Sequence, residues 1–326
     1  MHILVTNDDG PPSTTSSPYI LPFVKALEAA GHTVSVIVPD SQRSWIGKAH
    51  IVGQDVRATY YWPPSQVPHE HVNASTSDAR SSSSSHDDGS HPWVLINGTP
   101  AGCAQIGLSH FFTSDRGPID LVISGPNYGR NTSAVFALSS GTLGAALEAS
   151  HCGYKAIALS FAFTDRLNDP VIVAESCRHS VRVAEYLYQK ASWGPAQLYS
   201  VNVPVKKGCS EAPVRWTKVL QNEWNQGACF QELTSDEGVD DPASEEAKLR
   251  SQEAAGVSEE NVSKAPESKW KHRHFKWAPR FADVYESVLK SGPGSDGWAV
   301  KEGETSITAL RANFMHVEGF EGEVKL

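Results

Sequence analysis

The stretch MHILVTNDDG (1–10) decides the fold, because it places two adjacent carboxylates, Asp8 and Asp9, directly after a run of apolar residues. The apolar run predicts a short buried strand. Residues 18–30 predict a helix from the spacing of their apolar side chains, and residues 33–38 predict a second strand. The chain therefore starts with a βαβ unit, and the two carboxylates lie where its first strand ends.

Short apolar segments and amphipathic segments go on alternating beyond this unit. Further predicted strands cover residues 93–96, 121–124, 156–160 and 198–203, and further predicted helices cover residues 103–112, 142–152 and 176–190. This order predicts an α/β fold with a Rossmann-like, mostly parallel sheet, helices on both faces and right-handed crossovers. Because ligands of such sheets bind beyond the carboxyl ends of the strands, Asp8 and Asp9 are expected at the site.

Composition indicates a globular protein and excludes several classes. The 326 residues contain no apolar run of about eighteen, so no membrane span is expected. No secretory signal is recognised, and the five widely spaced cysteines fit neither a disulfide framework nor a zinc site, so we expect a cytoplasmic protein. The net charge of −9 and the lack of a basic face argue against a nucleic-acid polymer as partner.

Two segments are too polar to belong to a core. Residues 63–91 form a Ser-rich insertion, and residues 236–268 form an acidic one. Residues 235–260 alone carry a net charge of −7, which leaves about −2 for the rest of the chain. The rest of the chain predicts one α/β unit, so we expect residues 1–326 to form a single domain that contains the two insertions.

The first βα turn contains neither G-x-G-x-x-G nor the phosphate loop of nucleoside triphosphatases, so neither a dinucleotide nor a triphosphate is indicated there. Adjacent like charges at a strand end repel each other unless a cation lies between them. A divalent metal on Asp8 and Asp9 would remove this conflict. The alternative is that one of the two carboxylates only caps a helix or shapes a turn.

Loops after other predicted strands carry further oxygen ligands. They are PDSQRSWIG (39–47) with Arg43 and Ser44, SGPNYGRN (124–131) with Asn127 and Asn131, and SSGTLGAALEA (139–149) with Ser140, Gly141 and Thr142. Carboxylate, hydroxyl and amide oxygens suit Mg²⁺, Mn²⁺ or Ca²⁺ rather than zinc or copper. A Ser-Gly-Thr turn that opens a helix offers N–H groups and the positive end of the helix dipole to a phosphate.

These motifs, together with INGTPAGC, LYSVNVP and GETSITAL in the same order, resemble the SurE-type survival protein family of metal-dependent 5′/3′-nucleotidases and acid phosphatases, in a eukaryotic, fungal-like form. The resemblance implies a SurE-like fold with a divalent metal, Mg²⁺ or Mn²⁺ with Ca²⁺ as a further option. It implies the metal ligands Asp8, Asp9, Ser44 and Asn127. It also implies the substrate-binding residues Ser44, Asn127, Asn131, Ser140, Gly141 and Thr142, and the catalytic residues Asp8, Asp9, Asn131, Ser140 and Thr142.

The expected reaction is hydrolysis of a small phosphate monoester such as a nucleoside 5′- or 3′-monophosphate, or of a broader set of phosphomonoesters. Asp9 orients or deprotonates water, or acts as the nucleophile; the sequence leaves both roles open. Gly102 stands where the family has an acid, so the function of that acid is in doubt here. The resemblance also implies a homodimer or homotetramer, with residues 282–326 as an arm exchanged between subunits.

Other functions were weighed against this one. The first helix and second strand resemble those of a sugar-nucleotide glycosyltransferase, but the chain has little room for a second nucleotide-binding half. A non-enzymic receiver-like domain also has an acidic pair after its first strand. However, this chain has no counterpart of the phosphoacceptor Asp of such a domain, because the strand near Ser124 ends in Ser-Gly-Pro-Asn. His50, His110 and His151 have no metal-ligand spacing and are interpreted as packing or surface residues.

Overall fold

A computed structural model gives the structure of the chain. It describes residues 1–64, 66, 91–112, 116–163, 168–194, 196–224, 229–233 and 273–314. Most of the two predicted insertions, and residues 315–326 of the predicted exchanged arm, lie outside these ranges.

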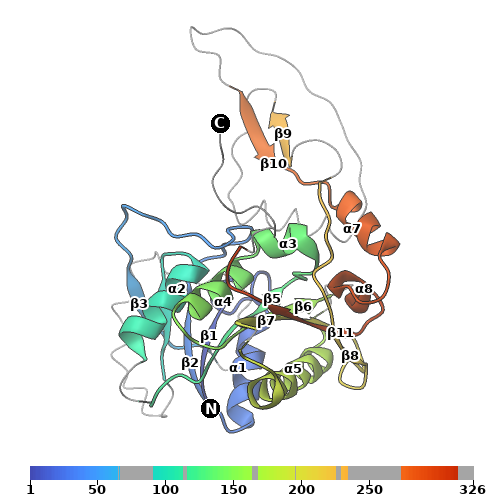
Figure 1. Ribbon diagram of the computed structural model, residues 1–326. Coiled ribbons are helices and arrows are strands. Elements are labelled where there is room, and N and C mark those ends of the chain that lie inside the picture. Colours follow the sequence, from blue (N-terminus) through green and yellow to red (C-terminus); the bar gives the residue numbers. More distant parts are fainter. Residues whose placement is uncertain are drawn as a thin grey trace, which may run out of the picture.

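A mixed sheet, nine-stranded within the described ranges, forms the centre of the molecule (Figure 1). Its order is β3 (Ala58–Tyr61), β4 (Trp93–Ile96), β2 (Thr33–Pro39), β1 (His2–Thr6), β5 (Leu121–Tyr128), β6 (Ala156–Ala162), β7 (Leu198–Pro204), β11 (Thr305–Leu310) and β8 (Val214–Trp216). The strands from β4 to β7 are all parallel. β3 is antiparallel to β4, and β11 is antiparallel to β7 but parallel to β8. The predicted mostly parallel sheet is confirmed, and β1 lies near its middle.

Helices cover both faces of the sheet, as predicted. α1 (Ile20–Ala29) and α5 (Pro170–Lys190) pack on one face with one hydrophobic cluster. α2 (Pro100–Ile106), the π-helix η1 (Gly107–Phe111) and α4 (Gly141–His151) pack on the other face with a second cluster. A single predicted helix over residues 103–112 is thus observed as α2 followed by η1.

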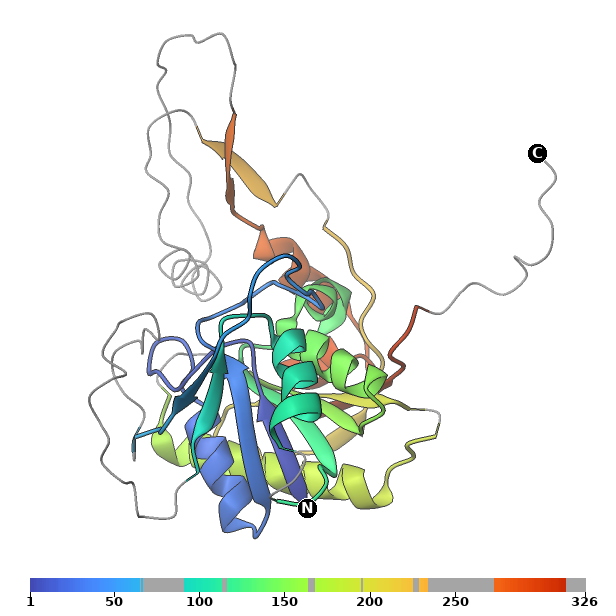
Figure 2. The same cartoon turned by 90° about the vertical axis from the view of Figure 1, so that its left-hand side faces the viewer.

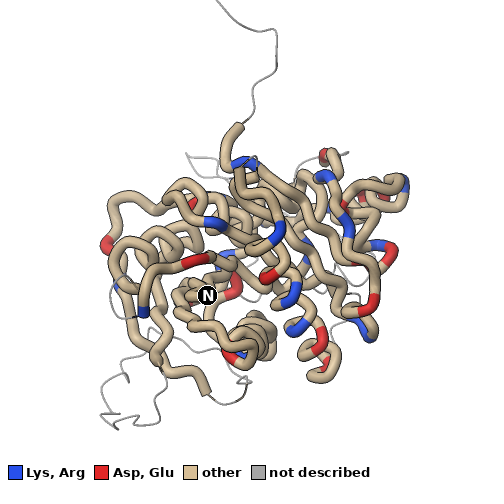
Figure 3. The backbone as a smooth tube through the Cα atoms, turned by 60° about the horizontal axis from the view of Figure 1, so that its bottom comes forward, with Lys and Arg blue, Asp and Glu red and all other residues tan. Residues whose placement is uncertain are grey.

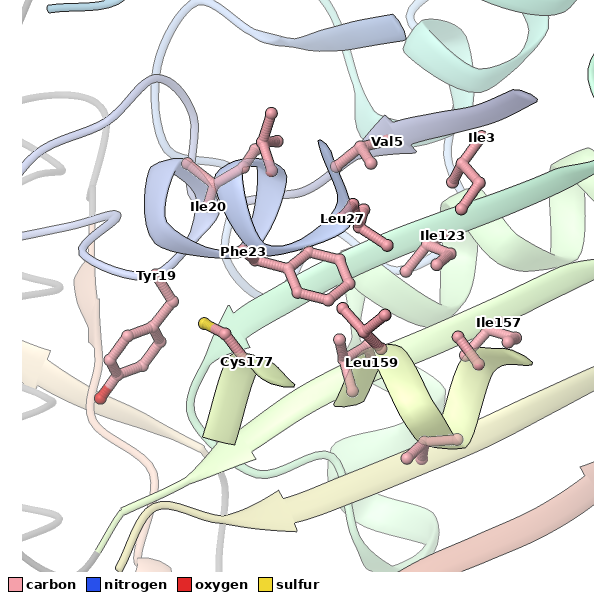
Figure 4. Packing of buried hydrophobic residues seen from close by; sticks show 14 of the residues in the cluster. Ile3, Val5, Tyr19, Ile20, Phe23, Leu27, Ile123, Ile157, Leu159 and Cys177 are labelled. Atoms are coloured by element: carbon pink, nitrogen blue, oxygen red, sulfur yellow. The ribbon is translucent and has the colours of Figure 1, made fainter. Parts of the chain in front are cut away.

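The α1 side of the core shows why residues 18–30 form a helix. Ile20, Phe23 and Leu27 recur at helical spacing and are fully buried, and Phe23 and Leu27 point toward the sheet residues Ile123 and Leu159 (Figure 4). Burying one such side chain contributes about 1.5–3 kcal/mol, so this one helical face is a major source of stability.

The later part of the chain adds elements around the carboxyl ends of the parallel strands. They are α3 (Ser133–Ser139), α7 (Phe281–Lys290), α8 (Asp296–Lys301) and an antiparallel hairpin of β9 (Phe230–Leu233) and β10 (His274–Trp277). The hairpin projects from the α/β body in both views (Figures 1 and 2). β11 lies in the sheet of its own chain, so exchange of residues 282–326 between subunits stays a prediction.

Each predicted insertion joins two neighbouring antiparallel strands. Residues 63–91 lie almost entirely between β3 and β4, and residues 236–268 lie between β9 and β10. Because a hairpin connection carries no strand of the parallel core, added length there leaves the core register unchanged.

Lys and Arg positions and Asp and Glu positions are interspersed along the described backbone in the view of Figure 3. Within the described ranges, no helix combines the length and the apolar character needed to cross a bilayer.

Candidate active site at the carboxyl ends of the parallel strands

Asp8 and Asp9 follow β1 directly and are almost fully buried, with 3% and 2% of their surfaces exposed. Asn7 shapes the turn that carries them: its Nδ2 donates to the Gly10 carbonyl at 2.8 Å, and its Oδ1 accepts from the Gly10 N–H at 3.1 Å. The backbone N–H of Arg43 donates to the Asp8 carbonyl at 2.7 Å, which brings the loop after β2 to the same place. Buried carboxylates need partners, and the surrounding loops supply them.

The N-terminus of α4 binds Asp8. The Thr142 hydroxyl donates to Asp8 Oδ1 at 2.7 Å, and the Thr142 N–H donates to Asp8 Oδ2 at 3.1 Å. Ser140 caps the helix, since its Oγ accepts from the Leu143 N–H at 3.1 Å. The predicted Ser-Gly-Thr turn therefore does open a helix, but both donors of Thr142 are directed at Asp8.

Two glycines allow α4 to approach the other loops closely. A Cβ on Gly141 would lie 2.8 Å from the Asp8 Cβ, and one on Gly144 would lie 2.4 Å from the Gly47 carbonyl oxygen. Both contacts are shorter than any side chain tolerates. The small residues of GTLG are therefore needed for the helix to meet Asp8 and the loop after β2.

Asp9 is held by the last residue of β5, Tyr128. Its Oδ2 accepts from the Tyr128 N–H at 2.6 Å, next to a register irregularity between β5 and β6 at Ser124 and Asn127. Asn127 is half-buried, and its Nδ2 donates to the Gly129 carbonyl at 2.9 Å. With the amide nitrogen bound in this way, the amide oxygen is the atom of Asn127 suited to a metal.

Asn131 is fixed by two strands that the sequence analysis did not connect to the site. Its backbone N–H donates to Asn202 Oδ1 of β7 at 2.8 Å, and its Nδ2 donates to Ser160 Oγ of β6 at 2.8 Å. Asn131, Ser160 and Asn202 are all buried. Polar residues inside otherwise apolar strands were the available sign, because a buried hydroxyl or amide has to find a partner.

The loop after β2 carries Ser44, which is half-buried and directly follows Arg43. The Gly47 N–H of this loop donates to the Ser139 carbonyl at 2.9 Å, where α3 ends. The next residue, Lys48, binds Glu148 of α4 with its Nζ at 2.6 Å. The loop is thus joined to both helices that flank the predicted phosphate position.

Trp45, next to Ser44, has a φ of +60°, a conformation that costs a bulky side chain about 1–2 kcal/mol. Its ring packs against Phe136 of α3, Trp277 of β10 and Phe281 of α7, with centroids 5.7, 5.4 and 5.6 Å away. The surrounding rings hold the backbone in this uncommon conformation.

A buried carboxylate of the C-terminal segment holds the start of α3. Asp296 is 2% exposed and accepts from the N–H groups of Ser133, Leu220 and Gly297 at 2.7–2.9 Å. Burial raises the pKa of the Asp296 carboxyl, and the three N–H groups only partly oppose this rise. Ser133 has a φ of +72° and lies two residues after Asn131, so Asp296 also steadies the Asn131 loop.

The donor set fits a hard divalent cation. Asp8 and Asp9 supply two carboxylates, and Ser44 and Asn127 come from the adjacent loops with one hydroxyl and one amide oxygen. In the described ranges, no group of three or more His, Cys, Asp and Glu residues could hold a metal, so a zinc site of nitrogen and sulfur ligands is not formed there. An oxygen-rich set with two carboxylates is typical of Mg²⁺ and Mn²⁺.

The structure thus places Asp8, Asp9, Asn127, Asn131, Ser140, Gly141 and Thr142 at one edge of the sheet, with Ser44 in the loop bonded to Asp8. His110 and His151 are exposed, and His50 lies 3.4 Å from Glu148 rather than at these residues. The sequence analysis missed Asn7, Tyr128, Ser160, Asn202 and Asp296. Asn7 had a local sign, an Asn that precedes a turn ending in Gly, and Ser160 and Asn202 had the sign of polar residues inside apolar strands.

Known proteins were compared with the chain. The family described as "Survival protein SurE" matches residues 3–226. A Saccharomyces cerevisiae protein described as "Probable tubulin--tyrosine ligase PBY1" is 31% identical, over 100% of this chain and 43% of that protein. The chain therefore spans less than half the length of that relative. A "5'-nucleotidase SurE" of Desulfovibrio desulfuricans is 30% identical, over 75% of this chain and 84% of that protein.

A solved structure shares the fold. The SurE protein of Aquifex aeolicus superposes with a TM-score of 0.60 and 19% identity, over 97% of this chain and 95% of that chain. The mostly parallel sheet with helices on both faces defines an α/β protein with a Rossmann-like fold. The chain is a member of the SurE survival protein family.

Proposed function

We propose that the chain is a metal-dependent phosphomonoesterase that hydrolyses nucleoside monophosphates. The observation that carries the proposal is the pair of nearly buried carboxylates, Asp8 and Asp9, held beside the N-terminus of α4. Membership of the SurE family and the 5′-nucleotidase names of its relatives support a hydrolase of phosphoric monoesters. They favour it over the glycosyltransferase and receiver alternatives.

The ligase name of the yeast relative does not lead to a second proposal. More than half of that protein has no counterpart in this chain, so its name covers a larger protein than the part compared.

Four residues would hold the metal: Asp8, Asp9, Ser44 and Asn127. When bound, a Mg²⁺ or Mn²⁺ ion, or Ca²⁺ as the further option, supplies Lewis acidity and lowers the pKa of a coordinated water. Asp8 is kept in place by Thr142, and Asp9 by the Tyr128 N–H, so neither carboxylate has to reorganise when substrate arrives.

The chain's own groups would bind the phosphate and handle the proton. The Gly141 N–H and the Ser140 hydroxyl lie at the N-terminus of α4, where the helix dipole favours an anion, and we propose that the Asn131 amide acts together with them. They would hold the equatorial oxygens as charge shifts in the transition state. Asp9 would orient the attacking water or accept its proton. The water oxygen would form the new bond to phosphorus while the bond from phosphorus to the nucleoside oxygen breaks. The nucleoside oxygen would take up a proton, either the one that the attacking water gave to Asp9 or one from solvent, so that the nucleoside leaves as an alcohol.

Three finer features remain predictions: activity on a wide range of phosphate monoesters at acid pH, a cytoplasmic location, and a homodimer or homotetramer. The five cysteines all fall in the described ranges and are free thiols, which agrees with a reducing compartment.

The test is phosphate release from nucleoside 5′- and 3′-monophosphates and from p-nitrophenyl phosphate by chelator-treated protein, with Mg²⁺, Mn²⁺ or Ca²⁺ added back. We expect activity only with added metal, and a loss of at least about 100-fold in Asp8→Asn and Asp9→Asn. Asp120→Asn is the matched control, because Asp120 lies at the opposite end of the same strands and binds the His2 N–H. Full activity of Asp8→Asn in chelator would reject the proposal.

A further inference from the structure

Ser44 differs from the other predicted metal ligands in how it is held. Asp8, Asp9 and Asn127 follow or lie on central strands of the sheet, whereas Ser44 lies five residues beyond the end of β2 in a half-buried loop. A neutral hydroxyl is a weak ligand and contributes to binding only when it is held close to its ideal position. The position of the Ser44 hydroxyl therefore depends on the backbone of the loop that carries it.

Trp45 is the residue placed to hold this backbone. It adjoins Ser44, and its φ of +60° sets the direction in which the chain leaves Ser44. A tryptophan adopts this conformation only where its surroundings enforce it. The indole ring is half-buried and belongs to a cluster that also contains Phe136, Trp277 and Phe281.

This cluster is assembled from distant parts of the chain. Phe136 belongs to α3, Trp277 ends β10 of the projecting hairpin, and Phe281 begins α7. Trp277 and Phe281 approach the Trp45 ring to 5.4 and 5.6 Å, a range in which aromatic pairs add about 0.5–1.5 kcal/mol to simple burial. The C-terminal segment thus packs directly against the residue that follows a predicted metal ligand.

We propose that Trp45, with Trp277 and Phe281 behind it, is a positioning residue that holds the Ser44 hydroxyl toward the metal carried by Asp8 and Asp9. The proposal rests on the metal site proposed above. If the proposal holds, metal affinity depends on Trp277 at the end of β10, although the β9–β10 hairpin carries none of the proposed ligands.

The test measures Mn²⁺ binding directly, by titration calorimetry on the full chain, for wild type, Trp277→Ala and Ser44→Ala. We expect each substitution to weaken Mn²⁺ binding about 10- to 100-fold, the usual range for losing a group that supports a metal ligand, with Ser44→Ala, which removes a proposed ligand itself, at least as weak as Trp277→Ala. The double variant Ser44→Ala with Trp277→Ala should bind no more weakly than Ser44→Ala alone, because Trp277 acts through Ser44.

Phe275→Ala is the matched control. Phe275 lies in the same strand β10, but its ring is half exposed and meets the Arg273 guanidinium at 5.1 Å instead of Trp45. It should leave Mn²⁺ affinity unchanged. Trp277→Phe should restore most of the affinity, because it keeps an aromatic ring against Trp45.

Trp45→Gly gives a second route in case Trp277→Ala does not fold. Glycine adopts a φ of +60° without strain, so this variant removes the ring while it keeps the backbone conformation allowed. We expect the same weakening of Mn²⁺ binding, about 10- to 100-fold. Unchanged Mn²⁺ affinity in Trp45→Gly or Trp277→Ala, or a further loss in the double variant, would overturn the positioning role. Absence of Mn²⁺ binding in wild type would instead reject the proposed metal site.

Discussion

Thr142 binds the carboxylate of Asp8 with two hydrogen bonds: its hydroxyl donates to Oδ1 at 2.7 Å, and its backbone N–H donates to Oδ2 at 3.1 Å. Thr142 is fully buried and Asp8 is nearly so. The first turn of α4 thus binds both oxygens of the Asp8 carboxylate, and in the proposed metal site Thr142 would orient that carboxylate.

Replacing Thr142 by valine should lower phosphate release about 10- to 100-fold, since a buried hydrogen bond to a charged group contributes roughly 1.5–3 kcal/mol. Thr142→Ser keeps the hydroxyl and should stay within a few-fold of wild type. The measurement is kcat/KM for a nucleoside monophosphate at saturating Mg²⁺. Equal losses in the valine and serine variants would show that the hydroxyl does not position Asp8.

Gly141→Ala should abolish most activity, because its Cβ would lie 2.8 Å from the Asp8 Cβ and 2.9 Å from Asp8 Oδ2. Either α4 or Asp8 has to move, and a shift of about 1 Å at a reacting group costs on the order of 100-fold in rate. Gly194→Ala is the control, since nothing lies within 4 Å of a Cβ at that position. If both alanine variants behaved alike, the close approach of α4 to Asp8 would be refuted.

Asp296 should make the stability of the chain depend on pH. Burial raises its pKa above the ordinary 3.8, so the folded chain holds this proton more tightly than the unfolded chain does. The stabilisation from that proton is complete below pH 3.8 and is lost as the pH rises through the raised pKa. Urea unfolding of wild type and Asp296→Asn from about pH 3.5 to 7 measures the difference in their free energies of unfolding at each pH. The stability of wild type relative to the variant should fall over that interval; a constant difference would contradict the prediction.

Glu148→Gln should destabilise the chain by about 1–3 kcal/mol at pH 7, because it removes a charged partner that is buried against Lys48. Burial alone would raise the pKa of Glu148, but Lys48 and His50 together lower it below the ordinary 4.5. The pair's contribution is therefore present above pH 4.5 and is lost as the pH falls through the lowered pKa. Thermal unfolding measures it. Glu286→Gln breaks an exposed pair with Lys290 and should change nothing detectable.

The parallel core could be predicted from sequence because its strands are continuous apolar runs. Strand β4 has the predicted bounds, and β1, β2 and β7 extend past theirs by one residue at one end or both. The start of α5 at Pro170 was placed six residues late, although Asp169 caps the helix and Pro170 suits its first position. The short strands β3, β8, β9 and β10 were not predicted, because only pairing with a neighbour makes such exposed segments strands.

For the candidate site, the residue types at strand ends predicted which loops come together at one edge of the sheet, while the roles of these residues stay predictions. The sequence could not show that Thr142 turns toward Asp8, or that Ser160 and Asn202 hold Asn131, because hydrogen-bond direction across loops depends on their relative placement. Nor could it show that Trp45 meets Trp277, since aromatic residues far apart in sequence carry no periodic signal.

Strand β11 lies between β7 and β8, both of which precede it in the chain. During translation the ribosome releases Asp8 early and Asp296 on the order of half a minute later, at ordinary rates of synthesis. Until then the nascent polypeptide has an open gap in its sheet, and Ser133 lacks the carboxylate that binds it. We therefore expect the sheet edge that carries Asp8 and Asp9 to be complete only after Asp296 and β11 have left the ribosome, because Ser133 and the gap between β7 and β8 depend on them.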